Sequence, residues 1–599
     1  MLDFYSCSIN DILMKRKSLR NQLSAVPGLQ ELRVAVLGGT TTDEVVNLFE
    51  LLLLADGFKP VFHQSEYGRF YEDAVHNTQE LADFKPNVIY IHTSCLNVQN
   101  APPLSCTEAD LPGYVEAELS RYREIWDSLD SKVGCQIIQN NFETPPHAVL
   151  GNMDAVSACG QSRFLMHLNV AFAHEASHRP KLLLQDVHGI SAHMGMRNWF
   201  NWDRYFSYKI LLTAEANLEL ARSLNSLVRA TYGKSRKVLV LDLDNTIWGG
   251  VIGDDGADKI QIGRETPVAE AYTAFQEYCL SLRNRGVLLA VCSKNTESVA
   301  KTGFSHPSAV LKLEHISCFK ANWDPKHENI HEIARELNLG VDSFVFVDDN
   351  PAEREIVRAQ VPGVAVPEVG NQVSKFVEII EQGRYFEPVS LSREDLERAA
   401  LYANNSQRAA QQNKFANYGE YLDSLEMVAE IDAFKPVYLD RIAQLTNKTN
   451  QFNLTTKRYS LADMERAVSD SSVIGLYGKL ADKFGDNGLI SIVLGRKQDS
   501  ALHMDLWLMS CRVLKREMEV AMLDAVVDRA RDRGIQAIYG YFFPTAKNAM
   551  VAEFYPTLGF QPHDSTRTDL PEGATVWRLN VLDHNERNKH IKVTEFTNG

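Results

Sequence analysis

One short stretch, residues 237–254, constrains this chain more than any other. It reads Lys-Val-Leu-Val-Leu-Asp-Leu-Asp-Asn-Thr-Ile-Trp-Gly-Gly-Val-Ile-Gly-Asp. The aliphatic run 238–241 suits a strand that is buried on both faces, as in a parallel sheet. The strand ends in Asp242 and Asp244, whose side chains point the same way because residues two apart share one face of a strand. Two carboxylates on one face repel each other, so the pair predicts either a bound cation or, as the plainer alternative, a strand end with solvated acids.

The length and composition of the chain limit the class of protein to which it can belong. A chain of 599 residues predicts several domains, and 45% hydrophobic with 23% charged residues is ordinary for a globular protein. The net charge of -15 argues against a binder of nucleic acid or of an anionic membrane. The nine cysteines form no CxxC pair, and we see neither a secretory leader nor an apolar run long enough to span a bilayer. We therefore expect a cytoplasmic protein with reduced thiols and no membrane insertion.

Residues 1–230 predict an α/β domain with a parallel sheet, because short apolar segments alternate with helical ones. The turn Gly38-Gly39-Thr40-Thr41 follows the first strand, and later polar positions include Asn140, Asn141, Gly160, Asp186 and His188. This set resembles the SGNH hydrolases, whose nucleophile is a serine after Gly-Asp. The turn here reads Gly-Gly-Thr, and a hydroxyl nucleophile also needs a positioned histidine. We therefore expect a fold relative without hydrolase activity, used for docking or scaffolding.

A second strand, residues 287–295, ends in a hydroxyl, a cation and an amide. These are Ser293, Lys294 and Asn295, and a helix follows from Thr296. A hydroxyl beside the free backbone N–H groups of a helix start forms a phosphate-binding corner. The alternative interpretation is an ordinary helix cap.

Two further segments add a lysine and a second acidic pair. Lys326 opens a predicted helix that runs to Leu337, although a cation at a helix N-terminus is unfavourable for the helix dipole. Its position suggests pairing with phosphate or with Asp242, whereas a solvated lysine is the alternative. The last apolar strand of this region, from residue 343, ends in Asp348 and Asp349. Oxygen ligands of this kind suit Mg²⁺, which would neutralise the acids and a phosphate together.

This ordered set resembles the four motifs of the haloacid dehalogenase (HAD) phosphohydrolases: Asp-x-Asp-x-Thr, then Ser, then Lys, then Asp-Asp. The resemblance implies that Asp242 attacks phosphorus and that Asp244 protonates the leaving oxygen and then activates water. It implies that Ser293 and Lys326 hold the phosphoryl group, with Thr246, Lys294 and Asn295 as further substrate-binding residues. Four residues would hold Mg²⁺: Asp242, the carbonyl group of Asp244, Asp348 and Asp349. The gaps 246–287 and 295–326 leave no room for a sizeable cap domain, so we expect an open site.

The final third predicts a helical connector, an α+β domain and a tail. The α+β domain resembles the GNAT acyltransferases, mainly through Phe554-Tyr555 and Leu558-Gly559-Phe560. Arg512 starts the segment that matches the pyrophosphate loop of that family, and the resemblance places Arg512 and Tyr555 at the acyltransferase site. Lys515 and Glu517 replace the two small residues of the loop. We therefore expect the phosphopantetheine arm of a carrier protein rather than coenzyme A.

The order of these domains, together with longer strings such as Cys292-Ser-Lys-Asn and Asn322-Trp-Asp-Pro-Lys, resembles the FkbH-like family. The resemblance implies that the HAD site takes 1,3-bisphosphoglycerate and removes phosphate, and that the glyceryl group ends as a thioester on an acyl carrier protein in polyketide or related biosynthesis. Cys292 and Cys511 are candidate acyl tethers, because a nearby cation favours thiolate. The alternative for each cysteine is a small buried residue.

The sequence thus predicts an α/β chain of three domains: SGNH/flavodoxin-like α/β, capless HAD Rossmann-like α/β, and GNAT-like α+β. The predicted boundaries are 1–230, 231–385, 386–425 for the connector, 426–582, and 583–599 for the tail. Three other functions stay open at this point. They are a Mg²⁺ phosphatase of a small phosphorylated acid or sugar, transfer of another acyl group in surface-glycan assembly, and a non-catalytic scaffold.

Overall fold

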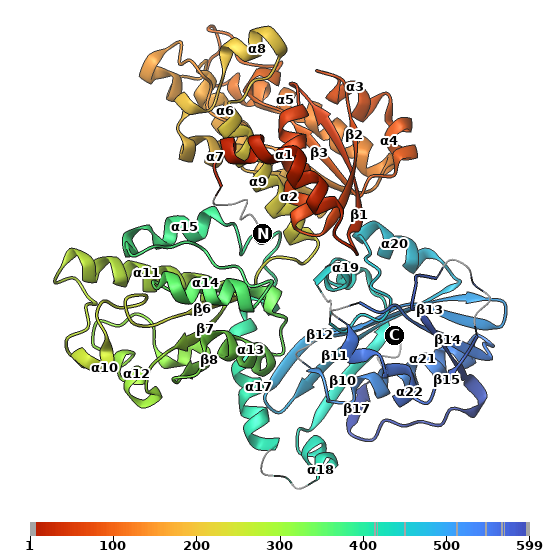
Figure 1. The fold of residues 1–599 in the computed structure, drawn as a ribbon. Coiled ribbons are helices and arrows are strands. Elements are labelled where there is room, and N and C mark those ends of the chain that lie inside the picture. The colour runs from red at the N-terminus through yellow and green to blue at the C-terminus, as the bar shows by residue number, and fades with distance from the viewer. Residues whose placement is uncertain are drawn as a thin grey trace. The chain divides into compact units, whose positions relative to one another are not determined.

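A computed structural model describes residues 7–412, 415, 417–448, 451–510, 513–545, 548–564, 567 and 570–594. The chain folds into two compact units, Met1–Arg229 and Ala230–Gly599. Figure 1 shows the elements of each unit. Among the described residues, no helix combines the length and the apolar character that a membrane span requires.

The first unit is built on a parallel sheet of five strands in the order β2-β1-β3-β4-β5. The strands are β1 (Gln30–Gly38), β2 (Phe58–Gln64), β3 (Val88–His92), β4 (Gln136–Asn140) and β5 (Leu182–Gln185). The main helices are α1 (Ile9–Ser24), α2 (Asp43–Ala55), α3 (Phe70–Val75), α4 (Thr78–Phe84), α5 (Leu111–Lys132), α6 (Gln161–His178), α7 (Val187–Met194), α8 (Trp202–Tyr208) and α9 (Ala214–Thr231). The predicted parallel α/β domain is confirmed. The strand order reverses between β1 and β3, which makes their carboxyl ends the switch point of this sheet.

The second unit opens with a parallel sheet of four strands in the order β8-β7-β6-β9. The strands are β6 (Val238–Leu241), β7 (Leu288–Ser293), β8 (Ile316–Ala321) and β9 (Phe344–Val347). The connecting helices are α10 (Ile252–Asp255), α11 (Pro267–Asn284), α12 (Glu297–Gly303), α13 (Lys326–Leu337), α14 (Pro351–Gln360) and α15 (Phe376–Gln382). The chain leaves β6 toward β7 and β8 and returns to β9 on the other side. The switch point therefore lies between β6 and β9.

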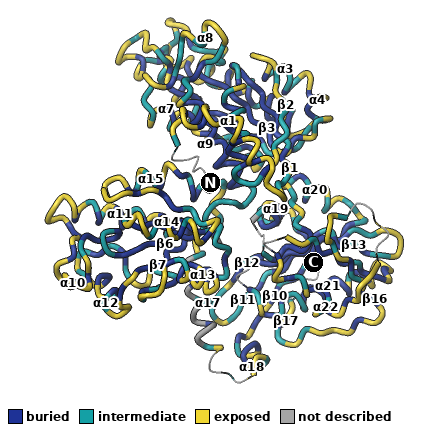
Figure 2. Tube along the Cα trace, in the orientation of Figure 1, coloured by how far each residue is buried: buried dark blue, intermediate teal, exposed yellow. Residues whose placement is uncertain are grey.

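Both faces of this sheet are covered by apolar side chains, as the sequence of β6 predicts. Leu239 and Leu241 pack with Phe275 of α11 on one face. Val238 and Val240 pack with Ile330 of α13 on the other. Figure 2 shows β6 and β7 as buried segments. Packing on two faces leaves the carboxyl edge of the sheet as the place where polar side chains can gather.

The remainder of the second unit is a mixed sheet of eight strands in the order β15-β16-β14-β13-β12-β11-β10-β17. The strands are β10 (Met427–Ala433), β11 (Val473–Asp482), β12 (Gly485–Gln498), β13 (Ala501–Met509), β14 (Ala537–Phe542), β15 (Gln561–Pro562), β16 (Thr575–Asn580) and β17 (Ile591–Thr594). The helices are α16 (Arg393–Leu396), α17 (Arg398–Gln412), α18 (Tyr418–Asp423), α19 (Leu439–Lys448), α20 (Leu461–Ser469), α21 (Met518–Asp532) and α22 (Phe554–Thr557). The parallel pair β13–β14 and the predominantly antiparallel remainder give this sheet a mixed character.

The predicted tail, residues 583–599, needs a correction. Within it, β17 pairs in parallel with β10 and forms one edge of the eight-stranded sheet. This pairing joins segments that are far apart in the sequence, so the short run Ile-Lys-Val-Thr carries no local sign of it. The strands β8, β10 and β16 are also absent from the sequence prediction, because each is only partly buried and mixes polar with apolar residues.

Candidate active site

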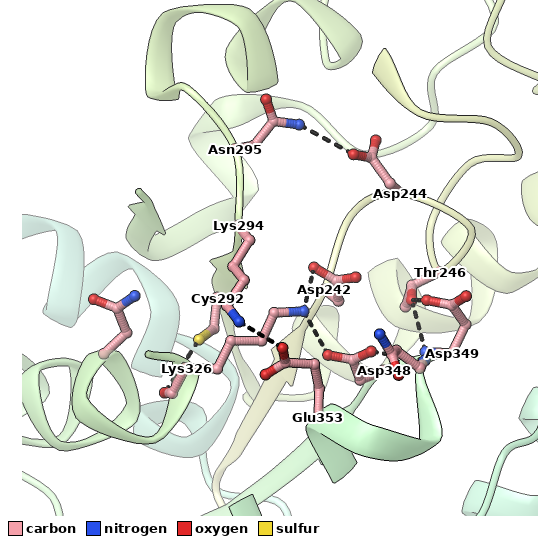
Figure 3. A network of polar contacts seen from close by, with 12 residues as sticks. Asp242, Asp244, Thr246, Cys292, Lys294, Asn295, Lys326, Asp348, Asp349 and Glu353 are labelled. Atoms are coloured by element: carbon pink, nitrogen blue, oxygen red, sulfur yellow. Dashed lines mark hydrogen bonds and ion pairs between the residues drawn. The ribbon is translucent and has the colours of Figure 1, made fainter. Parts of the chain in front are cut away.

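The carboxyl edge of the four-stranded sheet brings three of the predicted acidic residues together, namely Asp242, Asp348 and Asp349 (Figure 3). Asp242 directly follows β6, and Asp348 and Asp349 directly follow β9. Ser293 ends β7, and Lys326 is the first residue of α13, with the helix bounds that the sequence predicts. Parallel strands end at the same edge of a sheet, which explains why residues more than a hundred positions apart meet here.

Lys326 bridges the two acidic segments. Its Nζ lies 2.9 Å from Asp242 Oδ1 and 2.5 Å from Asp348 Oδ2, and its side chain is only 4% exposed. Burial disfavours the charge on this lysine, but the two carboxylates outweigh burial and raise the pKa of Lys326 above its usual range. The lysine is therefore a fixed cation at the switch point, and the solvated alternative is wrong.

Three carboxylates converge beside this lysine. One ligand oxygen each from Asp242, Asp348 and Asp349 lies within 4.8 Å of the others. Burial and the charge of Asp242 raise the pKa values of Asp348 and Asp349, against the opposing effect of Lys326. Three carboxylates that share one lysine still carry an excess of negative charge, and their oxygens fit a hard divalent cation such as Mg²⁺.

The side chain of Asp244 lies outside this cluster. Its Oδ1 accepts hydrogen bonds from Trp248 Nε1 at 2.8 Å and from the Ile252 amide at 3.0 Å, and its Oδ2 accepts one from Asn295 Nδ2 at 3.1 Å. Burial raises the pKa of Asp244, with a smaller contribution from Asp242, while the hydrogen bonds from Ile252 and Trp248 oppose the shift. A carboxyl group with a raised pKa, next to Asp242, suits a general acid and base. The sequence prediction did not include the two donors Trp248 and Ile252.

Thr246, Ser293 and Asn295 lie around these acids. The Thr246 hydroxyl accepts a hydrogen bond from the Asp349 amide at 3.2 Å, so it supports the second acidic pair. Ser293 is 2% exposed and its carbonyl group accepts the Asn322 amide at 3.2 Å. Asn295 is 5% exposed and contacts Asp244 as described above. A phosphate-binding role for Ser293 and Asn295 stays a prediction.

Lys294 differs from this pattern. Its Nζ pairs with Glu353 Oε1 at 2.6 Å, and its side chain is 41% exposed. The structure thus pairs Lys294 with the first turn of α14, and among the described residues no ion pair joins it to Asp242, Asp348 or Asp349. Glu353 was not predicted.

Cys292 does not present a reactive thiol. Its side chain is fully buried, and its Sγ donates to the carbonyl oxygen of Lys326 at 3.6 Å. Burial raises the pKa of Cys292 far more than the nearby Lys326 lowers it, so the expected activation by a cation is wrong for this cysteine. A small buried residue, the alternative from the sequence, describes Cys292 better than an acyl tether.

Among the residues that it describes, the structure supports no acyltransferase site at a position that the sequence predicts for it. Cys511 and Arg512 lie outside the described residues. Tyr555 is 1% exposed, packs against Trp507 and Phe560, and has a pKa raised by burial. It is therefore a core residue in this structure rather than a group open to a substrate.

Nothing inserted between β6 and β9 forms a cap. Residues 242–350 are described throughout. The first connection contains α10 and α11, the second contains α12 and a short 3₁₀ turn, and the third contains α13 and a short 3₁₀ turn. The predicted absence of a cap domain agrees with this chain path.

The five-stranded sheet carries a different group at its own switch point. His92 Nε2 lies 3.1 Å from Thr40 Oγ1, and His92 Nδ1 lies 3.0 Å from the Tyr90 hydroxyl and 3.3 Å from Asn140 Nδ2. Burial lowers the pKa of His92 to about 4. Both ring nitrogens of this neutral imidazole contact hydroxyl groups, so the direction of each hydrogen bond follows from the tautomer.

The other SGNH-like positions also serve the fold. Asp186 Oδ1 accepts hydrogen bonds from the Gly189 amide at 3.1 Å and from Asn141 Nδ2 at 2.8 Å, so it caps α7. The side chain of His188 is exposed, and a catalytic Asp186–His188 pair is not formed. Gly160 precedes α6 at a close approach, where a Cβ atom would lie 2.0 Å from the Asp154 carbonyl oxygen.

Searches of protein-family models and of curated proteins found no match to this chain. Among solved structures, the chain is similar to the N-terminal part of the protein BF1531 from Bacteroides fragilis, which contains a phosphatase domain and was determined in complex with Mg. The identity is 32%, the TM-score is 0.59, and the match covers 63% of this chain and 99% of that one.

Two weaker similarities concern acetyltransferases. The ribosomal-protein-S18-alanine N-acetyltransferase of Escherichia coli matches with 14% identity and a TM-score of 0.21, over 27% of this chain and 99% of that one. The PaiA N-acetyltransferase of Thermoplasma acidophilum, in complex with coenzyme A, matches with 15% identity and a TM-score of 0.20, over 25% of this chain and 98% of that one. Given the carboxylate site described above and the extent of the first match, this chain belongs to the same family as BF1531, the protein with a phosphatase domain in its N-terminal part.

Proposed function

We propose that the site at Asp242 carries out Mg²⁺-dependent phosphoryl transfer of the HAD type, through an aspartyl phosphate. The observation that carries the proposal is the bridge of buried Lys326 between Asp242 and Asp348, beside a third carboxylate, Asp349. This combination provides a nucleophile, a fixed cation and a cation-binding set at one point. The Mg complex of BF1531 supports the same assignment.

Each residue of the site has a role that follows from its position. Asp242, Asp348 and Asp349, with the carbonyl group of Asp244, would hold Mg²⁺, which when bound neutralises the carboxylates and a phosphoryl group together. A carboxylate oxygen of Asp242 attacks phosphorus, forming a P–O bond while the bond to the leaving oxygen breaks. Lys326 and Ser293 hold the phosphoryl oxygens, and electrostatic stabilisation supplies most of the rate.

Asp244 acts as the general acid and then as the general base. With its raised pKa it can give a proton to the leaving oxygen, and the resulting carboxylate can then take one from the water that attacks the aspartyl phosphate. Trp248, Ile252 and Asn295 fix the orientation of Asp244 through three hydrogen bonds. An acid held this firmly loses little entropy when the substrate binds.

The finer proposal follows the FkbH-like resemblance, with 1,3-bisphosphoglycerate as substrate and a carrier-protein thioester as product. The chemistry assigns the two phosphates of this substrate to different steps. Attack on the phosphorus of the acyl phosphate would release a free acid and lose its activation, so Asp242 must act on the phosphate ester. The carrier thiol attacks the acyl carbon: the C–S bond forms, the C–O bond to phosphate breaks, and the thiol proton leaves with the phosphate.

The acceptor would be the phosphopantetheine arm of an acyl carrier protein, with coenzyme A a less favoured acceptor. An uncapped site between β6 and β9 suits a reacting group that is delivered by a second macromolecule. A plain phosphatase of a small phosphorylated acid or sugar, and the transfer of another acyl group, are the competing outcomes of the test.

The test is mass spectrometry of a phosphopantetheinylated carrier protein incubated with the full chain, Mg²⁺ and 1,3-bisphosphoglycerate. We expect a glyceryl thioester on the carrier and release of both phosphates. The apo-carrier is the matched control and should stay unmodified. Asp242→Asn should give no glyceryl carrier, and any acylated product should keep its phosphate ester. Phosphate release without carrier acylation would contradict the finer proposal and leave a phosphatase.

A further inference from the structure

The two acids after β9 pose a geometric problem. Asp348 and Asp349 are consecutive, and consecutive residues of an extended chain point to opposite sides. Nevertheless, an oxygen of each lies within 4.8 Å of the other and of Asp242. The backbone must therefore turn between β9 and α14, and the turn must be held in place for both carboxylates to face one cation.

The guanidinium group of Arg354 holds this turn. Its Nη1 donates to the carbonyl oxygens of both Asp348 and Asp349, each at 2.8 Å. Arg354 is 4% exposed and lies in the first turn and a half of α14, whose side chains lean back toward the residues that precede the helix. One buried cation therefore fixes the peptide groups of both acids at once.

Smaller contacts complete the turn. The Asn350 amide donates to Asp348 Oδ1 at 2.8 Å, and the Asn350 side chain caps α14. On its outer edge, Arg354 contacts Glu368 Oε2 through Nε at 3.2 Å and Nη2 at 3.1 Å. A cation near a helix N-terminus is unfavourable for the helix dipole, so this arginine occupies a position that helix formation alone would not favour.

We propose that Arg354 is a positioning residue that sets the Mg²⁺ affinity of the site, a proposal that rests on the proposed function for the identity of the metal. The hydrogen bonds of Arg354 to the two acids go to their backbone carbonyl groups and not to their carboxylates. Arg354 acts through the carbonyl groups of Asp348 and Asp349, which it keeps at the spacing that one divalent cation requires. Lysine cannot replace it fully. Nη1 of Arg354 reaches both carbonyl oxygens while Nε and Nη2 contact Glu368, and a single ammonium group does not reproduce this planar arrangement.

The experiment is calorimetric titration of Mg²⁺ into the metal-free full chain, for the wild type and for Arg354→Lys and Arg354→Gln. Loss of a residue that supports metal ligands typically weakens metal affinity by about 10–100-fold. We expect about tenfold weakening for Arg354→Lys and about a hundredfold for Arg354→Gln. Arg358→Lys is the matched control, because Arg358 contacts the same Glu368 but, within the described part of the chain, bonds to neither acid. It should bind Mg²⁺ like the wild type.

Thermal unfolding and the phosphatase rate at saturating Mg²⁺ accompany the titration. We expect Arg354→Lys to keep a melting temperature close to that of the wild type and to recover most of the rate when Mg²⁺ is saturating. Unchanged Mg²⁺ affinity in a folded Arg354→Lys variant would overturn the role of Arg354 alone. A wild type that binds no Mg²⁺ would overturn the proposed function as well. If Arg354→Gln fails to fold, the Mg²⁺ affinity of Arg354→Lys still tests the role of Arg354.

Discussion

The chain contains two parallel sheets with the same kind of switch point and opposite chemistry. Between β1 and β3, Thr40 and His92 form a buried and neutral hydrogen-bonded group with Tyr90 and Asn140. Between β6 and β9, carboxylates and one lysine converge. A position at a sheet edge therefore does not by itself make a catalytic site. The two edges differ in the charge of the side chains that meet there.

The group between β1 and β3 is neutral, whereas the group between β6 and β9 concentrates three carboxylates beside one lysine. Burial keeps His92 uncharged, and both of its ring nitrogens have partners. At the other edge, burial and the charge of Asp242 raise the pKa values of Asp348 and Asp349, against the opposing effect of Lys326. One lysine offsets only part of the repulsion among three carboxylates, which favours the binding of a divalent cation.

The largest expected effect separates the two switch points directly. Asp242→Asn should lower phosphatase activity by at least about a thousandfold, because the amide cannot form the acyl phosphate. Thr40→Val at the first switch point should change the same rate less than about twofold. Steady-state hydrolysis of a phosphate monoester with Mg²⁺ measures both. A large loss of phosphatase rate in Thr40→Val would contradict the assignment of the chemistry to the switch point between β6 and β9.

The next effect concerns the two lysines near the site. Lys326→Met should lower the rate by about 100-fold or more, because the only cation between Asp242 and Asp348 within the described residues is lost. Lys294→Met, whose cation pairs with Glu353, should lower it less than about tenfold. The two variants are compared at saturating Mg²⁺. Equal losses would show that Lys294 also works at the phosphoryl group.

The stability of the metal-free protein should depend on pH through Asp348 and Asp349. A carboxyl group with a raised pKa in the folded state stabilises the fold below its unfolded value of about 4, and this contribution is lost as the pH rises through the folded pKa. Asp348 and Asp349 should therefore destabilise the metal-free protein at neutral pH. The increase in melting temperature on adding Mg²⁺ should be larger at about pH 7.5 than at about pH 5. An increase that is independent of pH would contradict this account.

The neutral edge should respond to pH in the opposite sense. The pKa of His92 is lowered to about 4, so its contribution is present above the unfolded value of about 6.5 and is lost as the pH falls through about 4. This shift corresponds to roughly 3 kcal/mol. Chemical unfolding should show a larger destabilisation by His92→Gln at pH 7 than at pH 4.5. The same destabilisation at both pH values would mean that His92 is not held neutral.

The smallest expected effect is at Cys292. Cys292→Ala should keep the phosphatase rate and any carrier acylation, and should cost about 1 kcal/mol of stability, because the thiol is buried and protonated. Alkylation of the native protein should leave Cys292 unmodified. An acyl adduct on Cys292, detected by peptide mass spectrometry, would restore the tether hypothesis.

Much of the middle sheet could be predicted from the sequence, because buried parallel strands are continuous apolar runs and α13 has the predicted bounds. Pairing of Lys326 with Asp242 was also predicted, because a lysine at a helix N-terminus is unfavourable for the helix dipole unless an anion lies near it. Other features depend on contacts between distant segments. The Lys294–Glu353 pair and the hold of Arg354 on two carbonyl groups follow from how the chain turns after β7 and β9. The edge strand β17 depends on pairing with β10, a partner far away in the sequence, which no local pattern encodes.

The central claim is that Asp242 becomes phosphorylated at the charged switch point. Its most direct test is acid quenching of the full chain during turnover of a phosphorylated substrate with Mg²⁺, followed by borohydride reduction and peptide mass spectrometry. The account predicts a reduced residue at Asp242 that depends on both substrate and Mg²⁺ and is absent from Asp242→Asn. Rapid turnover with no adduct at Asp242, or an adduct at another residue, would contradict it.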